Sequence, residues 1–304
     1  MSDMVKIFEV GLRDGLQYEQ QTFPVNIKIQ MAKKLISAGV KNLELGAFVS
    51  PKKVPQMTGT DALVEKMIID NYRQNWGVNF SALVPNDQGM MYAIGTGIRE
   101  VAVFTAASKI FAQKNINCTP AESLTRFASV VKLARQYQIR VRGYISTCFG
   151  CPFEGNVAEK KVLQLAEKLI DLGVYEISIG DTIGVATPKQ VKSLLANLYR
   201  FIPPNKLALH FHDTRGTAIA NVLEGLDRGI RAFDTSIGGL GGCPFAKGAQ
   251  GNVATEDVVY MLDGMGFKTG IDVKKLIKIN KWLQSLLGHN LPAKLSRAGV
   301  PWWL

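Results

Sequence analysis

The sequence predicts a (β/α)8 TIM barrel, an α/β fold, with extra C-terminal helices. Short β-rich runs alternate with amphipathic helical patterns along the chain, and such strict alternation implies a parallel sheet. About eight of these units follow one another within about 265 residues, which is the usual size of a TIM barrel. One local pattern also recurs at the junctions from helix to strand, as expected when a single β/α unit is repeated.

The recurring pattern is an amphipathic helix, a small or polar residue, a glycine, an aliphatic residue and a β-rich run. It occurs at residues 36–48, 94–106, 170–182 and 226–239. The glycines of these four segments stand where a helix C-terminus needs a left-handed residue; they are Gly39, Gly97, Gly173 and Gly229. The four to seven residues after each glycine are therefore expected to form a buried strand.

The other four strands are predicted at residues 5–11, 77–85, 139–147 and 206–213. Helical patterns separate the strands, with proline at the entrance of 24–39, a Thr-Pro start at 187–201 and a long amphipathic stretch at 120–137. A doubly wound open sheet is the alternative. It would usually carry a glycine-rich phosphate loop after the first strand, and "EVGLRDG" is not one.

The chain is expected to be a single domain over residues 1–304, because no linker or low-complexity segment divides it. The barrel should cover about 5–268 and a helical extension about 269–304. No apolar run is long enough to span a membrane, so no membrane partner is expected. The start has no signal-peptide pattern and the four cysteines are scattered, which favours a cytoplasmic location.

The net charge of +11 raises the question of a nucleic-acid partner. The lysines and arginines are spread along the whole chain, so no nucleic acid is expected, and a basic surface suits phosphorylated small ligands equally well. A non-enzymatic basic binding module is the alternative. It would bind nucleic acid in a salt-sensitive way, whereas a metal enzyme would be inhibited by EDTA.

Polar residues gather at the predicted strand ends, where TIM barrels place their chemistry. Two of the three histidines, His210 and His212, lie two apart on a predicted strand, so their side chains share one face. With an inward aspartate from another strand they would form a divalent-metal site. A hydrogen-bonded pair of core histidines is the alternative.

Other strand ends carry acids and a cation. Arg13 and Asp14 follow the first strand, as a fixed cation beside a metal ligand or as a plain loop salt bridge. Glu44 interrupts an apolar strand and needs a partner, for which Arg13 is the obvious candidate. Asp181 would bind metal, water or substrate, or cap the next helix.

Thiols occur in two notable places. Cys243 stands in the glycine-rich stretch 238–252, which would be a mobile active-site loop with a thiol acid/base, or an ordinary flexible loop. Cys148 and Cys151 form a C-x-x-C pair. No second pair completes a zinc site, so these thiols are expected to be structural.

Several segments resemble the 3-hydroxy-3-methylglutaryl-CoA lyases, a family within the TIM-barrel metallolyases. "EVGLRDGLQYE" at 9–19 matches the family's opening, and "GGLGGCPFAKGAQGN" at 238–252 matches its cysteine-loop signature. "YEISIGDTIGVATP" and "HFHDTRGTAIAN" match in order, so the resemblance covers residues 5 to 270.

The resemblance implies a metal site, a set of catalytic residues and a homodimer. The implied ligands of a divalent cation, Mg or Mn, are Asp14, His210, His212 and Asn252. Arg13 would stabilise an enolate, and Cys243 or His210 would supply a proton. The implied supporting residues are Glu44, Asp181 and Glu256, with Lys114 and Asn115 near the CoA end of the substrate.

The implied reaction is a retro-Claisen cleavage of 3-hydroxy-3-methylglutaryl-CoA to acetoacetate and acetyl-CoA. An acyl-CoA substrate is the implied partner, with no organic cofactor beyond its CoA. A related aldolase or Claisen synthase of the same superfamily is the alternative enzyme.

The sequence departs from the family pattern at a few positions near the expected site. They are Leu12 after the first strand, Leu45, Gly46 and Ala47 in the second strand, and Arg215 and Thr217 after the histidines. Loss of the strand hydroxyls would make the pocket less polar or roomier, and Arg215 would add a charge or face solvent. A longer branched 3-hydroxyglutaryl-CoA is therefore an alternative substrate.

Overall fold

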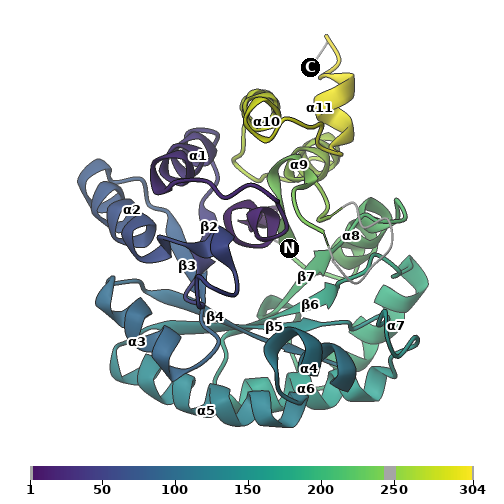
Figure 1. Ribbon diagram of the computed structural model, residues 1–304. Helices are drawn as coiled ribbons and strands as arrows, with labels where there is room; N and C mark the ends of the chain where they lie inside the picture. The colour runs from purple at the N-terminus through teal and green to yellow at the C-terminus, as the bar shows by residue number, and fades with distance from the viewer. Residues whose placement is uncertain (1–2, 243–250, 303–304) are drawn as a thin grey trace.

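Eight parallel strands close into a barrel in the computed structural model, which describes residues 3–242 and 251–302 (Figure 1). Each strand pairs with the next along the chain, and β1 pairs with β8 to close the ring. The strands are β1 Lys6–Glu9, β2 Asn42–Ala47, β3 Asn79–Leu83, β4 Glu100–Ala106, β5 Arg140–Ser146, β6 Glu176–Asp181, β7 Leu207–Phe211 and β8 Ala232–Thr235. The predicted TIM barrel is confirmed.

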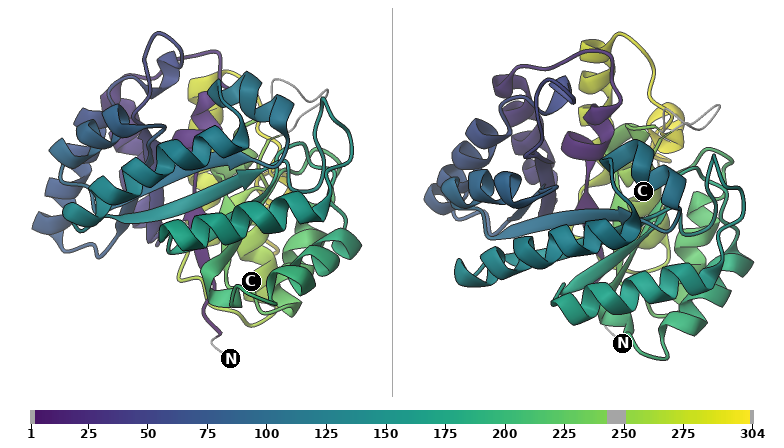
Figure 2. Two further views of the ribbon diagram at one scale, coloured as in Figure 1. Left: turned by 90° about the horizontal axis from the view of Figure 1, so that it is seen from below. Right: turned by 60° about the horizontal axis from the view of Figure 1, so that its bottom comes forward.

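Helices connect the strands and wrap the outside of the barrel (Figure 2). They are α1 Val25–Ser37, α2 Thr60–Gln74, α3 Asp87–Gly95, α4 Lys109–Ile116, α5 Pro120–Gln136, α6 Glu159–Leu172, α7 Pro188–Leu198, α8 Ala218–Asp227 and α9 Thr255–Gly264. Two more helices follow, α10 Val273–Leu287 and α11 Lys294–Ala298. α10 packs on α1 and α9, so the C-terminal segment covers the seam where β1 meets β8.

The four predicted helix-terminating glycines all adopt a positive φ, between 78° and 101°. Gly39 shows why no other residue fits, because a Cβ there would lie 2.1 Å from the carbonyl oxygen of Gly270. The helix starts also agree with the sequence signals. Thr187 and Gln190 form a capping box with Pro188 in the first turn of α7.

The strands end earlier than predicted on both sides of the site. β1 stops at Glu9 because Gly11–Gly15 forms a π-helical turn, a feature found often at functional sites. β7 stops at Phe211, and His212 instead forms an isolated antiparallel bridge with Asn252. The chain after β8 therefore folds back over the end of β7.

Among the described residues, no helix is long and apolar enough to cross a membrane.

The interior of the barrel holds charged side chains beside the apolar ones. Glu44, Arg142, Glu176 and Asp234 are each no more than 2% exposed. Buried charges require partners, and these partners organise the site.

Candidate metal centre and active site

The strands' C-terminal ends open into a cavity of about 940 Å³. Its lining includes residues that lie in or follow each of the eight strands, as expected for a TIM-barrel active site. Arg13, Asp14, His210 and His212 line it together with Tyr144. The predicted positions at the strand ends are therefore neighbours in space.

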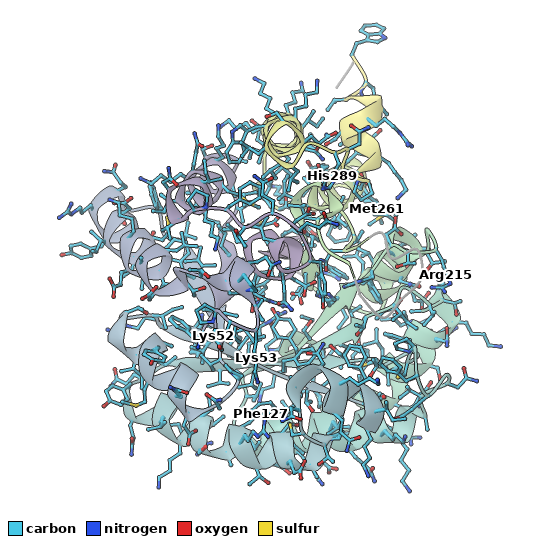
Figure 3. The ribbon with its side chains drawn as sticks, viewed as in Figure 1. Lys52, Lys53, Phe127, Arg215, Met261 and His289 are labelled. Carbon is cyan, nitrogen blue, oxygen red and sulfur yellow. The ribbon has the colours of Figure 1, made fainter. Side chains whose placement is uncertain are left out.

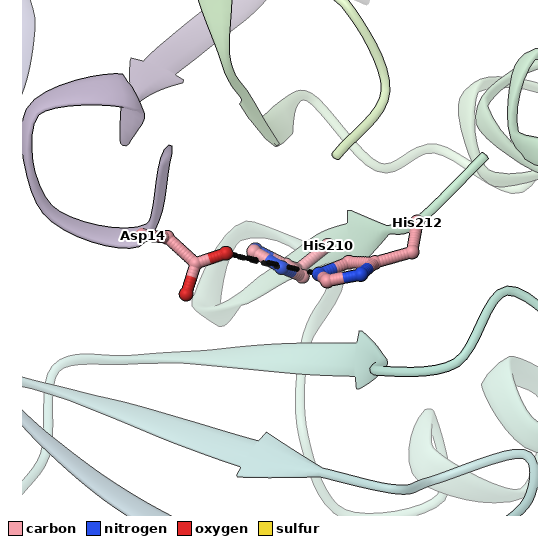
Figure 4. A group of neighbouring side chains, drawn as sticks. All are labelled: Asp14, His210 and His212. Carbon is pink, nitrogen blue, oxygen red and sulfur yellow. Dashed lines mark ion pairs between the residues drawn. The ribbon is translucent and has the colours of Figure 1, made fainter. Parts of the chain in front are cut away.

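Asp14, His210 and His212 form a cluster that could hold a metal ion, with one ligand atom from each within 4.8 Å of the others (Figure 4). The Nε2 atoms of His210 and His212 lie 3.9 and 3.7 Å from Oδ2 of Asp14. These separations exceed hydrogen-bond length. The mixed nitrogen and oxygen atoms suit a divalent cation between them.

Asn252 completes this group. Its Nδ2 donates to Oδ2 of Asp14 and to the carbonyl of Leu240, both at 2.9 Å. Its Oδ1 is buried and has no hydrogen-bond partner among the described residues. A buried carbonyl oxygen without a partner is costly, and a bound cation would satisfy it, so the donor set fits a metal.

Arg13 is held beside this cluster by two carboxylates. Its Nε lies 2.5 Å from Oε2 of Glu44, the partner predicted from the sequence, and its Nη1 lies 2.5 Å from Oδ1 of Asp14. The guanidinium also stands 5.2 Å from the ring centre of Tyr144. Burial alone would lower the pKa of Arg13, but Glu44 and Asp14 raise it well above its ordinary value.

Asp14 remains ionised for the same reason. Burial would raise its pKa, but the Arg13 guanidinium and the two histidine rings lower it below its usual range. The cluster therefore presents a carboxylate, not a carboxylic acid, at neutral pH. An ionised carboxylate beside two imidazoles is the state that a cation requires.

Glu9 is a buried acid whose role the sequence analysis missed. Oε1 accepts hydrogen bonds from the backbone N–H groups of Gly11 and Ile237, and Oε2 accepts one from the Thr255 hydroxyl. Glu9 thus ties the π-helical turn that carries Arg13 to the segment after β8. The signal was an acid within an apolar strand, as at Glu44.

Glu9→Gln should change how stability depends on pH. Burial raises the pKa of Glu9 from 4.5 to about 7 despite its hydrogen bonds. The folded state therefore holds this proton more tightly than the unfolded chain. The contribution of protonated Glu9 to folding stability is complete below about pH 4.5 and is lost as the pH rises through about 7. Between pH 4.5 and pH 8, the free energy of unfolding of Glu9→Gln should rise by on the order of 3 kcal/mol relative to that of the wild type. This figure follows from about 1.4 kcal/mol for each tenfold change in proton affinity.

Urea unfolding of both proteins at pH 4.5 and pH 8 measures this difference. Glutamine preserves the shape, and its Oε1 can still accept from the N–H groups of Gly11 and Ile237, while its amide NH2 would donate to the Thr255 oxygen instead of accepting from it. The exposed Glu65→Gln serves as control. A difference between wild type and Glu9→Gln that stays constant with pH would contradict the expectation.

Two of the expected supporting acids, Asp181 and Glu256, accept hydrogen bonds from backbone N–H groups. Asp181 accepts from the N–H groups of Val185 and Ala186, so it fixes the loop before α7. Glu256 accepts from the N–H of Gly238 and from the side chains of Asn280 and Ser296. Glu256 thus attaches the C-terminal helices to the segment that follows β8.

The two residues expected near the CoA end of the substrate, Lys114 and Asn115, differ in their surroundings. Asn115 lines the cavity, whereas the Nζ of Lys114 stands 4.9 Å from the ring centre of Phe153. Cys243 lies outside the described residues, although its neighbour Gly242 lines the cavity. The thiols of the C-x-x-C pair are buried and bond separately. Cys148 donates to the carbonyl of Ile145 and Cys151 lies 3.0 Å from the Ser108 hydroxyl.

Most of the positions that depart from the family pattern do not line the cavity. Ala47 lines the cavity, but Leu45 packs in the core, and a Cβ on Gly46 would meet Thr60. Arg215 lies at the side of the barrel near α8 (Figure 3) and donates to the carbonyls of Ile183 and Gly184. Thr217 donates to the carbonyl of Ala186, so both residues fasten the loop before α7.

A closed barrel with an Asp/His/His group that could hold a metal ion and a buried arginine at its carboxyl end has the features expected of a TIM-barrel lyase. Comparisons agree with this class. The HMGL-like family profile matches residues 4–283. The chain belongs to this family of carbon–carbon lyases, which confirms the resemblance seen in the motifs.

Relatives of similar length support the assignment. The chain is 48% identical over 296 residues to the hydroxymethylglutaryl-CoA lyase of Pseudomonas mevalonii, covering 97% of this chain and 96% of the relative. It is 46% identical to the 3-hydroxy-3-isohexenylglutaryl-CoA/hydroxy-methylglutaryl-CoA lyase of Pseudomonas aeruginosa, covering 97% and 96%. An HMG-CoA lyase from Acinetobacter baumannii, solved with coenzyme A and 3-methylmalate, superposes with a TM-score of 0.92 at 36% identity, covering 100% of this chain and 98% of that one.

Proposed function

We propose that this chain cleaves 3-hydroxy-3-methylglutaryl-CoA to acetoacetate and acetyl-CoA by a metal-dependent retro-Claisen reaction. The observation that carries the proposal is the grouping of Asp14, His210 and His212 around one point, with Arg13 fixed beside them. The family relationship supplies the substrate, because the named relatives act on this thioester.

The residues that would hold the metal are Asp14, His210, His212 and Asn252. When bound, a divalent cation, Mg or Mn, supplies Lewis acidity toward the substrate's 3-hydroxyl and a neighbouring oxygen. The chain itself supplies the orientation. The π-helical turn fixes the position of Asp14, and β7 fixes that of His210. The bridge between His212 and Asn252 fixes the positions of these two residues.

Arg13 would stabilise the charge that develops as the C2–C3 bond breaks. The electron pair of that bond passes to the thioester fragment and forms an enolate, while the hydroxyl carbon becomes the ketone of acetoacetate. A cation held by Glu44 and Asp14 needs no reorganisation at that moment, which is the most effective form of electrostatic stabilisation.

Two proton transfers complete the reaction. Asp14 or a water molecule would accept the hydroxyl proton. Cys243 would donate a proton to the enolate carbon and yield acetyl-CoA. This role is in keeping with a thiol in a glycine-rich sequence next to Gly242, which lines the cavity. His210 is the alternative donor.

The CoA part of the substrate would lie toward the outer part of the cavity. Lys53, Arg126 and Asn115 line this part, and cations suit the phosphate groups of CoA. The Acinetobacter relative was solved with coenzyme A, which supports an acyl-CoA as the partner of this chain. The homodimer remains a proposal from the resemblance alone.

A longer 3-alkyl substrate is the second candidate. Phe48, Leu83, Phe104 and Phe127 line the cavity beside Ala47 and give it a large apolar surface. Branched apolar groups gain free energy from such a surface, and the Pseudomonas aeruginosa relative is named for an isohexenyl substrate as well.

An assay of purified protein with Mg²⁺ or Mn²⁺ tests both candidates. We expect 3-hydroxy-3-methylglutaryl-CoA to yield acetoacetate and acetyl-CoA in equal amounts, and EDTA to abolish this yield until metal is restored. A 3-isohexenyl analogue run in parallel ranks the two substrates by kcat/KM. Cleavage that persists unchanged in EDTA would contradict the metal-dependent reaction.

A further inference from the structure

A group of buried polar side chains lies inside the barrel next to the metal cluster. We call it the interior network; it consists of Arg142, Glu176, Ser178 and Asp234, from β5, β6 and β8. Each is at most 2% exposed. These charges need partners, and their bonds to one another supply most of them.

Asp234 is the most heavily bonded member of the interior network. Its Oδ1 accepts from Nη2 of Arg142 at 2.8 Å, and its Oδ2 accepts from Nη1 at 3.2 Å. The Ser178 hydroxyl donates to Oδ2 at 2.6 Å. Arg142 is itself fixed, because its Nε donates to Glu176 at 2.7 Å and its guanidinium lies 4.1 Å from the ring centre of Phe8. The Asp234 carboxylate therefore has one well-defined position.

This carboxylate also reaches the metal cluster. Oδ2 of Asp234 lies 3.3 Å from Nδ1 of His210, and the two residues are register partners on β7 and β8. Asp14 faces the other ring nitrogen, Nε2. His210 thus has a carboxylate on each side, and only the one at Nδ1, from Asp234, lies within hydrogen-bond distance.

The two histidines differ in this respect. Nδ1 of His212 is buried and has no hydrogen-bond partner among the described residues. A carboxylate next to Nδ1 favours the proton on that nitrogen. Nε2 then keeps a free lone pair, which it can donate to a metal ion. Only His210 has such a partner.

We propose that Asp234 is a positioning residue that holds His210 in its Nδ1–H tautomer, so that Nε2 is ready to ligate the cation. The inference rests on the proposed metal site. Asp234 acts through His210 rather than on the substrate, and its direct bonds to Arg142 and Ser178 hold it in place.

Asp234→Asn and Glu176→Gln form a matched pair that tests this proposal. Each replaces a buried carboxylate that bonds to Arg142, but only Asp234 contacts His210. Mn²⁺ binding can be measured from the free Mn²⁺ signal in electron paramagnetic resonance, on samples whose thermal unfolding confirms a folded state. We expect Asp234→Asn to weaken Mn²⁺ binding by about 10- to 100-fold and Glu176→Gln to leave it within about twofold. Equal loss in both variants, or no loss in Asp234→Asn, would overturn the proposal.

A second measurement needs no network variant. In the metal-free wild type labelled with ¹⁵N-histidine, two-bond ¹H–¹⁵N spectra report the tautomer of each ring, and the His210→Ala variant assigns the signal. A protonated Nδ1 on His210 supports the proposal, and a protonated Nε2 with a bare Nδ1 overturns it. If the wild type binds no Mn²⁺, the proposed metal site fails, while the tautomer still decides the part assigned to Asp234.

Discussion

Arg13→Met should lower kcat by about three orders of magnitude and change KM little, because an interaction made mainly in the transition state is lost. The methionine keeps much of the length and apolar stem of arginine but brings no charge to the enolate. Glu44 and Asp14 would lose their shared cation. Steady-state kinetics with 3-hydroxy-3-methylglutaryl-CoA and saturating Mg²⁺ measure both constants.

Arg200→Met is the control for this experiment, since Arg200 is exposed on the outside of the barrel after α7. It should retain wild-type kcat. A rise in KM at constant kcat for Arg13→Met would make Arg13 a substrate-binding residue and remove it from the stabilisation of the enolate.

His210→Ala and His212→Ala should each weaken the binding of Mg²⁺ or Mn²⁺ and reduce kcat by at least two orders of magnitude. Each substitution removes one of the nitrogen atoms that converge near Asp14. Loss of a ligand removes both affinity and the correct orientation of what remains. Calorimetric titration with Mn²⁺, followed by activity at high metal concentration, separates these two effects.

His289→Ala provides the matched control, because it removes the remaining histidine of the chain. His289 is exposed near the C-terminal helices (Figure 3) and bonds to Glu19 on the surface. It should bind metal and turn over as the wild type does. Normal metal affinity in either His210→Ala or His212→Ala would remove that residue from the metal site.

Much of the site could be predicted because its signals are local. The spacing of His210 and His212 follows the two-residue period of a strand, and their rings do lie together, 5.3 Å apart. The pairing of Glu44 with Arg13 followed from the cost of an unpaired acid in an apolar strand. Glu9 and Asp234 are also acids within apolar strands, but the sequence did not predict their partners, because those partners come from distant parts of the chain.

Other residues were placed by loop geometry that no sequence spacing specifies. Asp181 bonds to amides of its own loop, and Arg215 bonds to two carbonyls of that same loop. Their side chains satisfy backbone groups that have no strand or helix partner. Whether a polar residue at a strand end serves the substrate or the loop depends on where those groups point.

The sequence by itself determined the barrel and the repeated β/α unit with its terminating glycines, and it placed His210 and His212 on one face at the end of a strand. These depend on periodicity and turn chemistry, which act over a few residues. Only the tertiary structure decided that Asp234 faces His210, that Glu9 joins the turn after β1 to the segment after β8, and that Arg215 bonds to the loop before α7. The physical reason is that closure of β1 onto β8 and the register between strands set which buried charges meet, and these contacts join residues up to 246 positions apart.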